Sequence, residues 1–438
     1  MRFAVKCRII LLALTLMMSR IVFAGGETDL GAELEAIKAL LKEQQAQIQR
    51  QQEQIEHQQA EIDRLRGAVE AKKPSDELVA EEVHRTVKDA IEEKGITAVY
   101  DKGFTLRSAD DKFRLDIGGW VQPRYEYTTS TGDDEDSSSF FMRRVRVDIR
   151  GHVFTPALTF RIMPEFARTA NLRDAWINYE FDRELQARFG QYTVPFQWHR
   201  FVGPRRQHFA ERSNVSETFG FFQGRDIGLG LHGINQDQTF AYGVGLFDGA
   251  GRNNERSNSS GNMASGRVGF ALLGVIPREE SDLAWSEEPK LAIGAGLQGA
   301  TRNEIRDWDL DRSPSDNHRA DWASATGDVR FAFKGFSVAG EGFVRRVSPK
   351  DSLVDSYTGA GWGLTGGYFI IPKQFEFVGR YNRLRLDNDD SDTQETEWGL
   401  GMNVYHQGHD WKTRFNFLSH TTDEFREQRV LLEHHLQF

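Results

Sequence analysis

The sequence is poor in features on which several classes of protein depend. It contains one cysteine in 438 residues, which excludes a disulfide framework and any zinc or iron–sulfur site built from cysteines. No apolar run reaches the roughly 18–20 residues that a transmembrane helix needs, so a polytopic helical membrane protein is excluded. The formal net charge of −10 provides no general electrostatic reason to bind nucleic acid, and none is expected as a partner.

Motifs for catalysis and cofactor binding are absent or out of context. The chain has no G-x-S-x-G nucleophile elbow and no H-E-x-x-H zinc motif. Three G-x-G-x-x-G patterns begin at Gly228, Gly294 and Gly361, but each lies within an alternating segment and none opens a helix, as dinucleotide binding requires. Small residues at every second position relieve crowding in a curved sheet instead. The sequence therefore predicts no enzyme: no catalytic residue, no cofactor and no bound metal.

The first 24 residues have the pattern of a secretory signal peptide. Arg2, Lys6 and Arg8 form a positive region, residues 9–18 are apolar, and a small-residue cleavage site ends at Ala24. A short buried helix is the alternative interpretation. Cleavage would remove four basic residues and the only cysteine, which leaves 51 basic and 65 acidic residues and a net charge of −14. We therefore expect an exported protein without cysteine.

Residues 25–72 are predicted to form a coiled coil that joins copies of the chain. A heptad repeat runs from residue 30 to residue 69, with polar residues at most other positions. Position a holds Leu34, Leu41, Ile48, Ile55, Ile62 and Val69, and position d holds Leu30, Ile37, Gln44, Gln51, Gln58 and Leu65. Isoleucine at a with three successive polar d positions favours a trimer; a single amphipathic helix packed on its own domain is the alternative. Residues 73–100 are predicted to be a helical or charged linker.

From residue 101 to residue 438 the hydrophobic pattern has a period of two, which predicts strands. Along residues 113–127 the odd positions are mostly apolar, whereas Arg114 and Arg124 share the even positions with other polar residues. Residues 141–153 alternate in the same way. Many such segments are long enough to cross a membrane, and one face is rich in aromatics. This pattern predicts an all-β transmembrane barrel with lipid outside and water inside, and a soluble β-protein is the alternative.

The connections between the predicted strands support an outer-membrane barrel of about sixteen strands. Long polar loops alternate with tight turns, an asymmetry that such barrels show between their external and periplasmic ends. Residues 277–289 are the exception, because this join is long where a tight turn is due. The chain ends on Phe438 after alternating apolar residues, which resembles the outer-membrane assembly signal, although His434 interrupts the apolar face. An even strand count places both ends, and hence the coiled coil, in the periplasm.

Several sequence motifs, which follow one another in a fixed order, are similar to those of a known protein family. They are the sequences FRLDIGG (residues 113–119), NLRDAWINYEF (171–181), FGQYTVPF (189–196), Glu211-Arg212-Ser213 and RDIG (225–228). With them, residues 100–438 resemble the phosphate-selective porin O and P family. The resemblance implies a trimeric, sixteen-stranded porin whose third external loop folds into the channel. In this chain the third external connection, residues 195–224, is also the longest.

The resemblance also implies a series of inward-facing arginines that pass anions along the channel. Guanidinium suits this role because it stays charged and pairs bidentately with phosphate oxygens, and several moderate sites in series still let the ion leave. The alternative is a charge-balanced wall, in which acids such as Asp148 and Glu165 neutralise the arginines. The candidates on the polar faces and in the third loop are Arg114, Arg124, Arg144, Arg146, Arg150, Arg161, Arg200, Arg205, Arg206 and Arg212.

Two functional hypotheses follow. In the first, the protein is an outer-membrane porin that forms a water-filled channel for passive diffusion of small anions such as phosphate. In the second, it is a general or weakly selective porin whose periplasmic coiled coil tethers the envelope, with peptidoglycan as the partner of the coil. Both expect a homotrimer in contact with outer-membrane lipid and lipopolysaccharide.

Overall fold

The computed structural model describes parts of two units, residues 1–89 and 90–438. The described residues are 38, 42, 46, 49–50, 52–64, 95–100, 103–131, 136–221, 224–254, 261–304, 319–350, 356–388 and 391–438. No helix among them is long and apolar enough to cross a membrane.

In the first unit, every described residue is helical, including the continuous stretch 52–64. Ile55 and Ile62, both at predicted position a, are exposed in the single chain. The predicted signal peptide and much of the predicted coiled coil lie outside the described residues, so the association of this segment with other copies stays a prediction.

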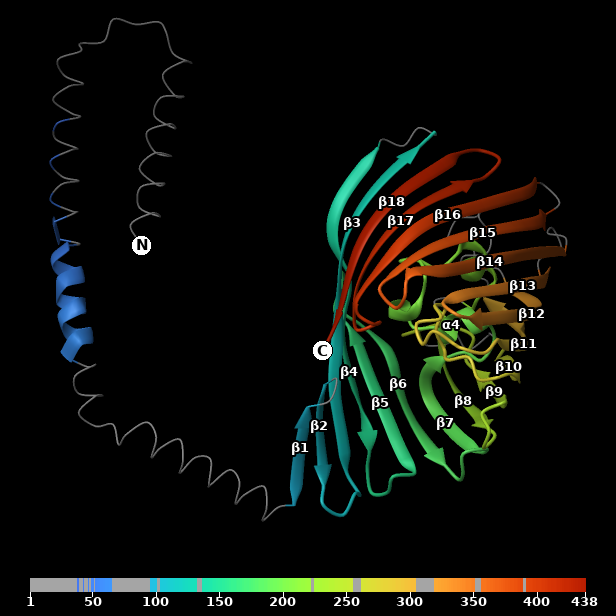
Figure 1. Ribbon diagram of the computed structural model, residues 1–438, viewed down its shortest axis with the longest axis horizontal. Coiled ribbons are helices and arrows are strands. Elements are labelled where there is room, and N and C mark those ends of the chain that lie inside the picture. The colour runs from blue at the N-terminus through green and yellow to red at the C-terminus, as the bar shows by residue number, and fades with distance from the viewer. Residues whose placement is uncertain are drawn as a thin grey trace, which may run out of the picture. The chain divides into compact units, whose positions relative to one another are not determined.

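The second unit contains a closed barrel of sixteen antiparallel strands, β3 to β18, as Figure 1 shows. The predicted fold class is thereby confirmed. The ring closes where β18 pairs with β3, and beyond the last pair the backbone N–H of Gly119 donates to the carbonyl of Phe438 at 2.9 Å. The strands are β1 (Ile96–Tyr100), β2 (Phe104–Ser108), β3 (Arg114–Ser130), β4 (Ser137–His152), β5 (Leu158–Glu165), β6 (Asn171–Glu180), β7 (Gln186–Thr193), β8 (Arg225–Ile234), β9 (Phe240–Phe247), β10 (Met263–Leu273), β11 (Lys290–Glu304), β12 (Arg319–Phe333), β13 (Phe336–Pro349), β14 (Tyr357–Ile371), β15 (Phe375–Asn388), β16 (Ser391–Gln407), β17 (Trp411–Thr421) and β18 (Arg426–Gln437).

The two faces of the barrel wall follow the alternation in the sequence. On β16, Trp398 and Leu400 are exposed on the outer face, while Glu397 and Asn403 on the inner face are buried. A polar side chain that faces the inside of a barrel is buried only where other parts of the chain cover it. The interior is therefore partly filled, and two connections between strands fill it.

A hairpin of β1 and β2 precedes the barrel and extends its sheet, because β2 pairs with the first residues of β3. β1 begins at Ile96, within the segment predicted as linker. Gly95, with a φ of +61°, separates the preceding charged residues from the β-favouring sequence ITAVY. The strand is too short for its period to stand out from the linker.

At the end of the barrel where β3 begins and β18 ends, most connections between strands are tight turns. Tight turns are typical of the periplasmic end of an outer-membrane barrel. Lys334 and Gly335, for example, both have positive φ, as a two-residue hairpin turn requires. The connection between β10 and β11, residues 274–289, is far longer, and we call it the inner turn. At the other end, residues 194–224 join β7 to β8; we call them the constriction loop. It contains α4 (Trp198–Phe201), η2 (Pro204–Arg206) and α5 (Asn214–Phe219), and α4 is visible inside the ring in Figure 1.

Candidate functional site

A cavity of about 510 Å³ lies between the constriction loop and the wall formed by β3 to β8, and we call it the arginine cavity. Its lining extends from Arg225, at the external end of β8, to Arg114 and Gln437 at the periplasmic ends of β3 and β18. Three carboxylates line it, those of Asp116, Asp148 and Asp174. Twelve arginines line it: Arg114, Arg146, Arg150, Arg161, Arg173, Arg188, Arg200, Arg205, Arg206, Arg212, Arg225 and Arg278.

Strand register brings the wall arginines together. On β4, Arg146 and Arg150 lie on the inner face, and Arg150 is directly opposite Arg161 of β5. Arg161 Nε donates to Asp148 at 2.7 Å, and Arg146 Nε donates to Glu165 at 2.6 Å. Cationic groups therefore follow one another along the wall at the two-residue spacing of strands, with acids beside some of them.

The constriction loop supplies the opposite side of the cavity. Arg200, in α4, is buried and donates to Glu217 at 2.6 Å. Arg205, in the short helix that Pro204 begins, approaches Asp410 at 3.3 Å. Arg212 donates to the carbonyl oxygen of Val202 at 2.9 Å. Burial, together with the neighbouring charge of Arg200, lowers the pKa of Arg212 to about 9. An anion beside this guanidinium would relieve both effects.

Half of the twelve arginines have no carboxylate oxygen within 4 Å among the described residues. Arg114, Arg146, Arg161, Arg200, Arg205 and Arg225 each have a carboxylate oxygen within 4 Å. Within the part of the chain that the structure describes, the other six have no such carboxylate: Arg150, Arg173, Arg188, Arg206, Arg212 and Arg278. The wall is thus only partly charge-balanced, and its excess is positive.

The structure brings eight of the ten predicted arginines together in this cavity. Arg124 and Arg144 do not line it; they are buried in contacts with the constriction loop and neighbouring strands. Four arginines that the sequence reasoning did not select line it as well: Arg173, Arg188, Arg225 and Arg278. The matched motifs contain Arg173 and Arg225, and Arg188 alternates with outward residues of β7, so these three had a detectable signal. Arg278 had none, because it lies in the inner turn.

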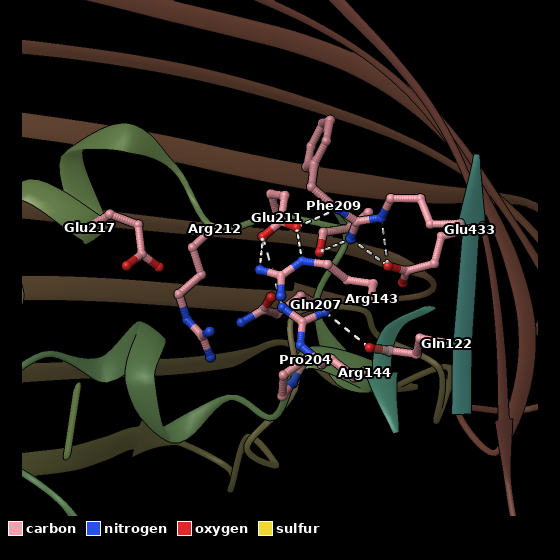
Figure 2. A network of polar contacts seen from close by, with 12 residues as sticks. Gln122, Arg143, Arg144, Pro204, Gln207, Phe209, Glu211, Arg212, Glu217 and Glu433 are labelled. Atoms are coloured by element: carbon pink, nitrogen blue, oxygen red, sulfur yellow. Dashed lines mark hydrogen bonds and ion pairs between the residues drawn. The ribbon is translucent and has the colours of Figure 1, made fainter. Parts of the chain in front are cut away.

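Glu211 anchors the constriction loop to the wall, as Figure 2 shows. Its carboxylate accepts hydrogen bonds from Arg143 at 2.6 and 3.1 Å and from Arg124, and Arg144 lies 3.8 Å away. Burial alone would raise the pKa of Glu211, but these three guanidiniums hold it well below its ordinary value. Glu433 pairs in turn with Arg124, whose Nε donates to it at 3.1 Å. The first residue of the Glu211-Arg212-Ser213 motif therefore has a structural role, because it holds the constriction loop against the wall.

Two further arginines hold the backbone of the loop. Arg414 of β17 donates from one nitrogen to the carbonyl oxygens of Pro204 at 3.0 Å, Gln207 at 3.2 Å and Phe209 at 2.9 Å. Arg345 of β13 donates to the carbonyl of Thr218 at 2.8 Å, near the C-terminal end of α5. A loop held in this way narrows the barrel at a defined position.

The inner turn is attached to the constriction loop through histidines. Glu280 accepts a hydrogen bond from the backbone N–H of His208 at 2.5 Å and lies 2.8 Å from Nε2 of His199. His208 Nε2 is 3.3 Å from Glu376 of β15. Burial raises the pKa of Glu280, but His199 and His208 lower it to about 2. Burial lowers the pKa of His208, but Glu376 and Glu280 outweigh it, so the net pKa is raised. We call this group of contacts the latch.

The raised pKa of His208 predicts that its contact with Glu376 in the latch weakens as the pH rises. A raised pKa at His208 means that its stabilisation is complete below the ordinary value of 6.5 and is lost as the pH passes the folded pKa. The depressed pKa of Glu280 keeps its contribution intact above its ordinary value of 4.5. We expect the current through single channels to fluctuate more at alkaline than at mildly acidic pH. In His208→Gln, recordings should be noisy and insensitive to pH; an unchanged pH dependence would exclude the latch as its source.

The comparisons with known proteins agree with this geometry. The profile of the phosphate-selective porin O and P family matches residues 116–436. No curated protein sequence matches the chain. The loop-deletion form of OmpT from Vibrio cholerae has a TM-score of 0.53 at 11% identity and covers 74% of this chain and 100% of its own.

Two other solved structures are similar to the same extent. They are the trimer form of Vibrio cholerae OmpT (TM-score 0.52, 11% identity, 74% and 100% covered) and an anion-selective porin from Comamonas acidovorans (0.52, 12%, 74% and 99%). At such identities the likeness shows the fold alone. With the family profile matching most of the chain, the protein belongs to the phosphate-selective porin O and P family and is an outer-membrane β-barrel porin, not an enzyme.

Proposed function

We propose that this porin conducts small anions, phosphate among them, through the arginine cavity by passive diffusion. The observation that carries the proposal is the group of six cavity arginines without a carboxylate within 4 Å in the described part of the chain, on both sides of the constriction. A cation that its own wall does not neutralise attracts a mobile anion. A wall built only for balance would pair each arginine with an acid.

The arrangement also favours transport over tight capture. Arg173 and Arg225 lie near the external end of the cavity, Arg212 and Arg206 at the constriction loop, and Arg114 toward the periplasmic end. An anion can move between such sites by exchanging one guanidinium for the next, and no single site has to bind it strongly. Planar guanidinium groups match the oxygens of phosphate in a bidentate manner.

We also propose that three chains assemble through the N-terminal segment, with its coiled coil in the periplasm. Ile55 and Ile62 support this, because both occupy predicted position a of a helical stretch and are exposed in the single chain. The trimer form of the similar Vibrio cholerae OmpT supports a threefold assembly of the barrel. The coil adds a second set of contacts to such a trimer.

The test is the reversal potential of single channels in a planar bilayer under a KCl gradient. We expect wild-type channels to prefer chloride and the combined variant Arg150→Ala, Arg206→Ala, Arg212→Ala to lose about fivefold or more of that preference. One contact between opposite charges at about 4 Å is worth about 1 kcal/mol even in water, which corresponds to a factor of about five.

A matched control removes arginines that do not line the cavity. Arg383, on β15, donates to Gln394 at 2.9 Å, and Arg426 begins β18; neither lines the arginine cavity. The combined variant Arg383→Ala, Arg426→Ala should keep the wild-type chloride preference. Cation preference in the wild type, or an equal loss in both variants, would contradict anion conduction through this cavity.

A further inference from the structure

A second cavity of about 510 Å³ lies on the other side of the constriction loop and has a different character. Its walls come from β7 to β12, from the loop around Trp198 and Phe201, and from residues 275–278 of the inner turn. In the part of the chain that the structure describes, no carboxylate lines it. We call it the mixed cavity, because aromatic and aliphatic side chains line it together with four arginines. Its volume is in the range of sites for small organic ligands.

Small residues create this space. The inner-face positions Gly230, Gly243 and Gly269 line the cavity, together with several alanines. A Cβ atom added at Gly269 would meet only the carbonyl oxygen of Ile293, at 3.8 Å, so the volume above this residue is open. Glycine at position 269 keeps a hollow that a larger side chain would fill, whereas Gly230 and Gly243 leave room for Tyr192 and Pro195, which pack against them.

Aromatic rings form one side of the hollow. Trp198, Phe201 and Tyr192 line it, and the first two also carry guanidinium groups over their rings: Arg330 lies 5.1 Å from the ring centre of Trp198, and Arg278 lies 5.4 Å from that of Phe201. A planar apolar group entering the cavity would therefore find two aromatic rings that each have a cation over one face.

The polar groups of the cavity are left incompletely satisfied. Arg267 and Arg330 both pair with Asp328, but Arg188 and Arg278 have no carboxylate within 4 Å among the described residues. Among the described residues, the buried hydroxyl oxygen of Tyr192 has no hydrogen-bond partner, and Tyr192 is only 6% exposed. A buried unpaired donor is costly, and a ligand oxygen would satisfy it.

The geometry points to a binding site for small aromatic carboxylates in the mixed cavity. The carboxylate would pair with Arg188 and Arg278, and the ring would rest on Trp198 and Phe201 beside the glycine wall. Arg188 and Arg278 line both cavities, so the site lies beside the anion path and opens into it. This inference adds a ligand class that inorganic anion conduction does not require, since phosphate has no apolar part to bury.

The test is calorimetric titration of the detergent-solubilised full-length porin with sodium benzoate, with inorganic phosphate and the neutral benzyl alcohol as comparison probes. We expect benzoate to bind, benzyl alcohol not to bind, and Gly269→Leu to weaken benzoate at least about tenfold, the equivalent of 1.4 kcal/mol, while phosphate binding stays unchanged. The leucine side chain would occupy the open volume above residue 269, which the ring of benzoate needs.

A matched control places the same substitution elsewhere on the wall. Gly342 of β13 has nothing within 4 Å of an added Cβ and does not line the mixed cavity, so Gly342→Leu should bind benzoate as the wild type does. If Gly269→Leu fails to fold, Ala271→Leu provides the second variant, because Ala271 lines the mixed cavity and does not line the arginine cavity. At least about tenfold weaker benzoate binding is again expected.

The inference is overturned if benzoate does not bind, if benzyl alcohol binds equally well, or if Gly269→Leu leaves benzoate affinity unchanged. The last result would place benzoate with phosphate in the arginine cavity. Because titration does not depend on ion flow, it stays informative if the channel proves not to be anion-selective.

Discussion

Glu211→Gln is expected to lower the free energy of unfolding of the barrel by about 3–5 kcal/mol, the cost of removing one member of a buried charge cluster. The carboxylate compensates Arg124, Arg143 and Arg144, and Figure 2 shows Arg143 and Arg144 converging on it. The glutamine is nearly isosteric but neutral, so three guanidiniums would stay together with less compensation. Repulsion among them would then push the constriction loop away from the wall.

The measurement is urea-induced unfolding of the refolded porin in lipid vesicles, combined with single-channel recording. A displaced loop should also produce larger and more variable conductance. Glu217→Gln is the matched control, because Glu217 lies in the same loop and pairs with Arg200 but is 51% exposed. Arg200 is buried, but the half-exposed carboxylate of Glu217 leaves the pair accessible to water, so a smaller loss than that of Glu211→Gln is expected. Equal effects of the two variants would show that Glu211 is not the anchor.

Arg414→Met is expected to cost a similar amount, about 3–5 kcal/mol, for a different reason. Its guanidinium satisfies the carbonyls of Pro204, Gln207 and Phe209 and pairs with Glu433, and its side chain is fully buried. Methionine fills part of the space but donates no hydrogen bond. Three carbonyls and one carboxylate would then be buried with fewer partners.

Unfolding in urea also measures the loss of unfolding free energy in Arg414→Met. The accessibility of the constriction loop to protease provides a second readout. Arg429→Met is the control: Arg429 lies on the adjacent strand and pairs with Glu427 at 3.1 Å, with both side chains partly exposed. We expect less than about 1 kcal/mol for it. A stable Arg414→Met protein with a protected loop would mean that other contacts suffice to hold the segment.

The alternation along the strands was sufficient to predict which wall side chains face inward. The even positions of β3 and β4 include Arg114, Arg146 and Arg150, and all three line the arginine cavity. A period of two is a local property of strands, so it can be observed in sequence without knowledge of the rest of the fold. The constriction loop was also detectable, as the longest of the external connections.

The different roles of arginines on one face could not be predicted in this way. Arg144 and Arg146 are two residues apart on β4, yet only Arg146 lines the cavity. A register shift beside Gln122 brings Arg143 to the inner side next to Arg144, where both meet Glu211. Neither the shift nor the partner, which lies in a distant loop, can be seen in the local pattern.

The sequence by itself determined the barrel, its two faces and the excess of arginine on the inner one, because these depend on the order of apolar and polar residues along each strand. Only the tertiary structure decided which of the arginines have no carboxylate within 4 Å in the described part of the chain. That outcome depends on where the constriction loop and the inner turn come to rest, and ion pairs between residues far apart in the chain, such as Glu211 with Arg124 and His199 with Glu280, hold them there.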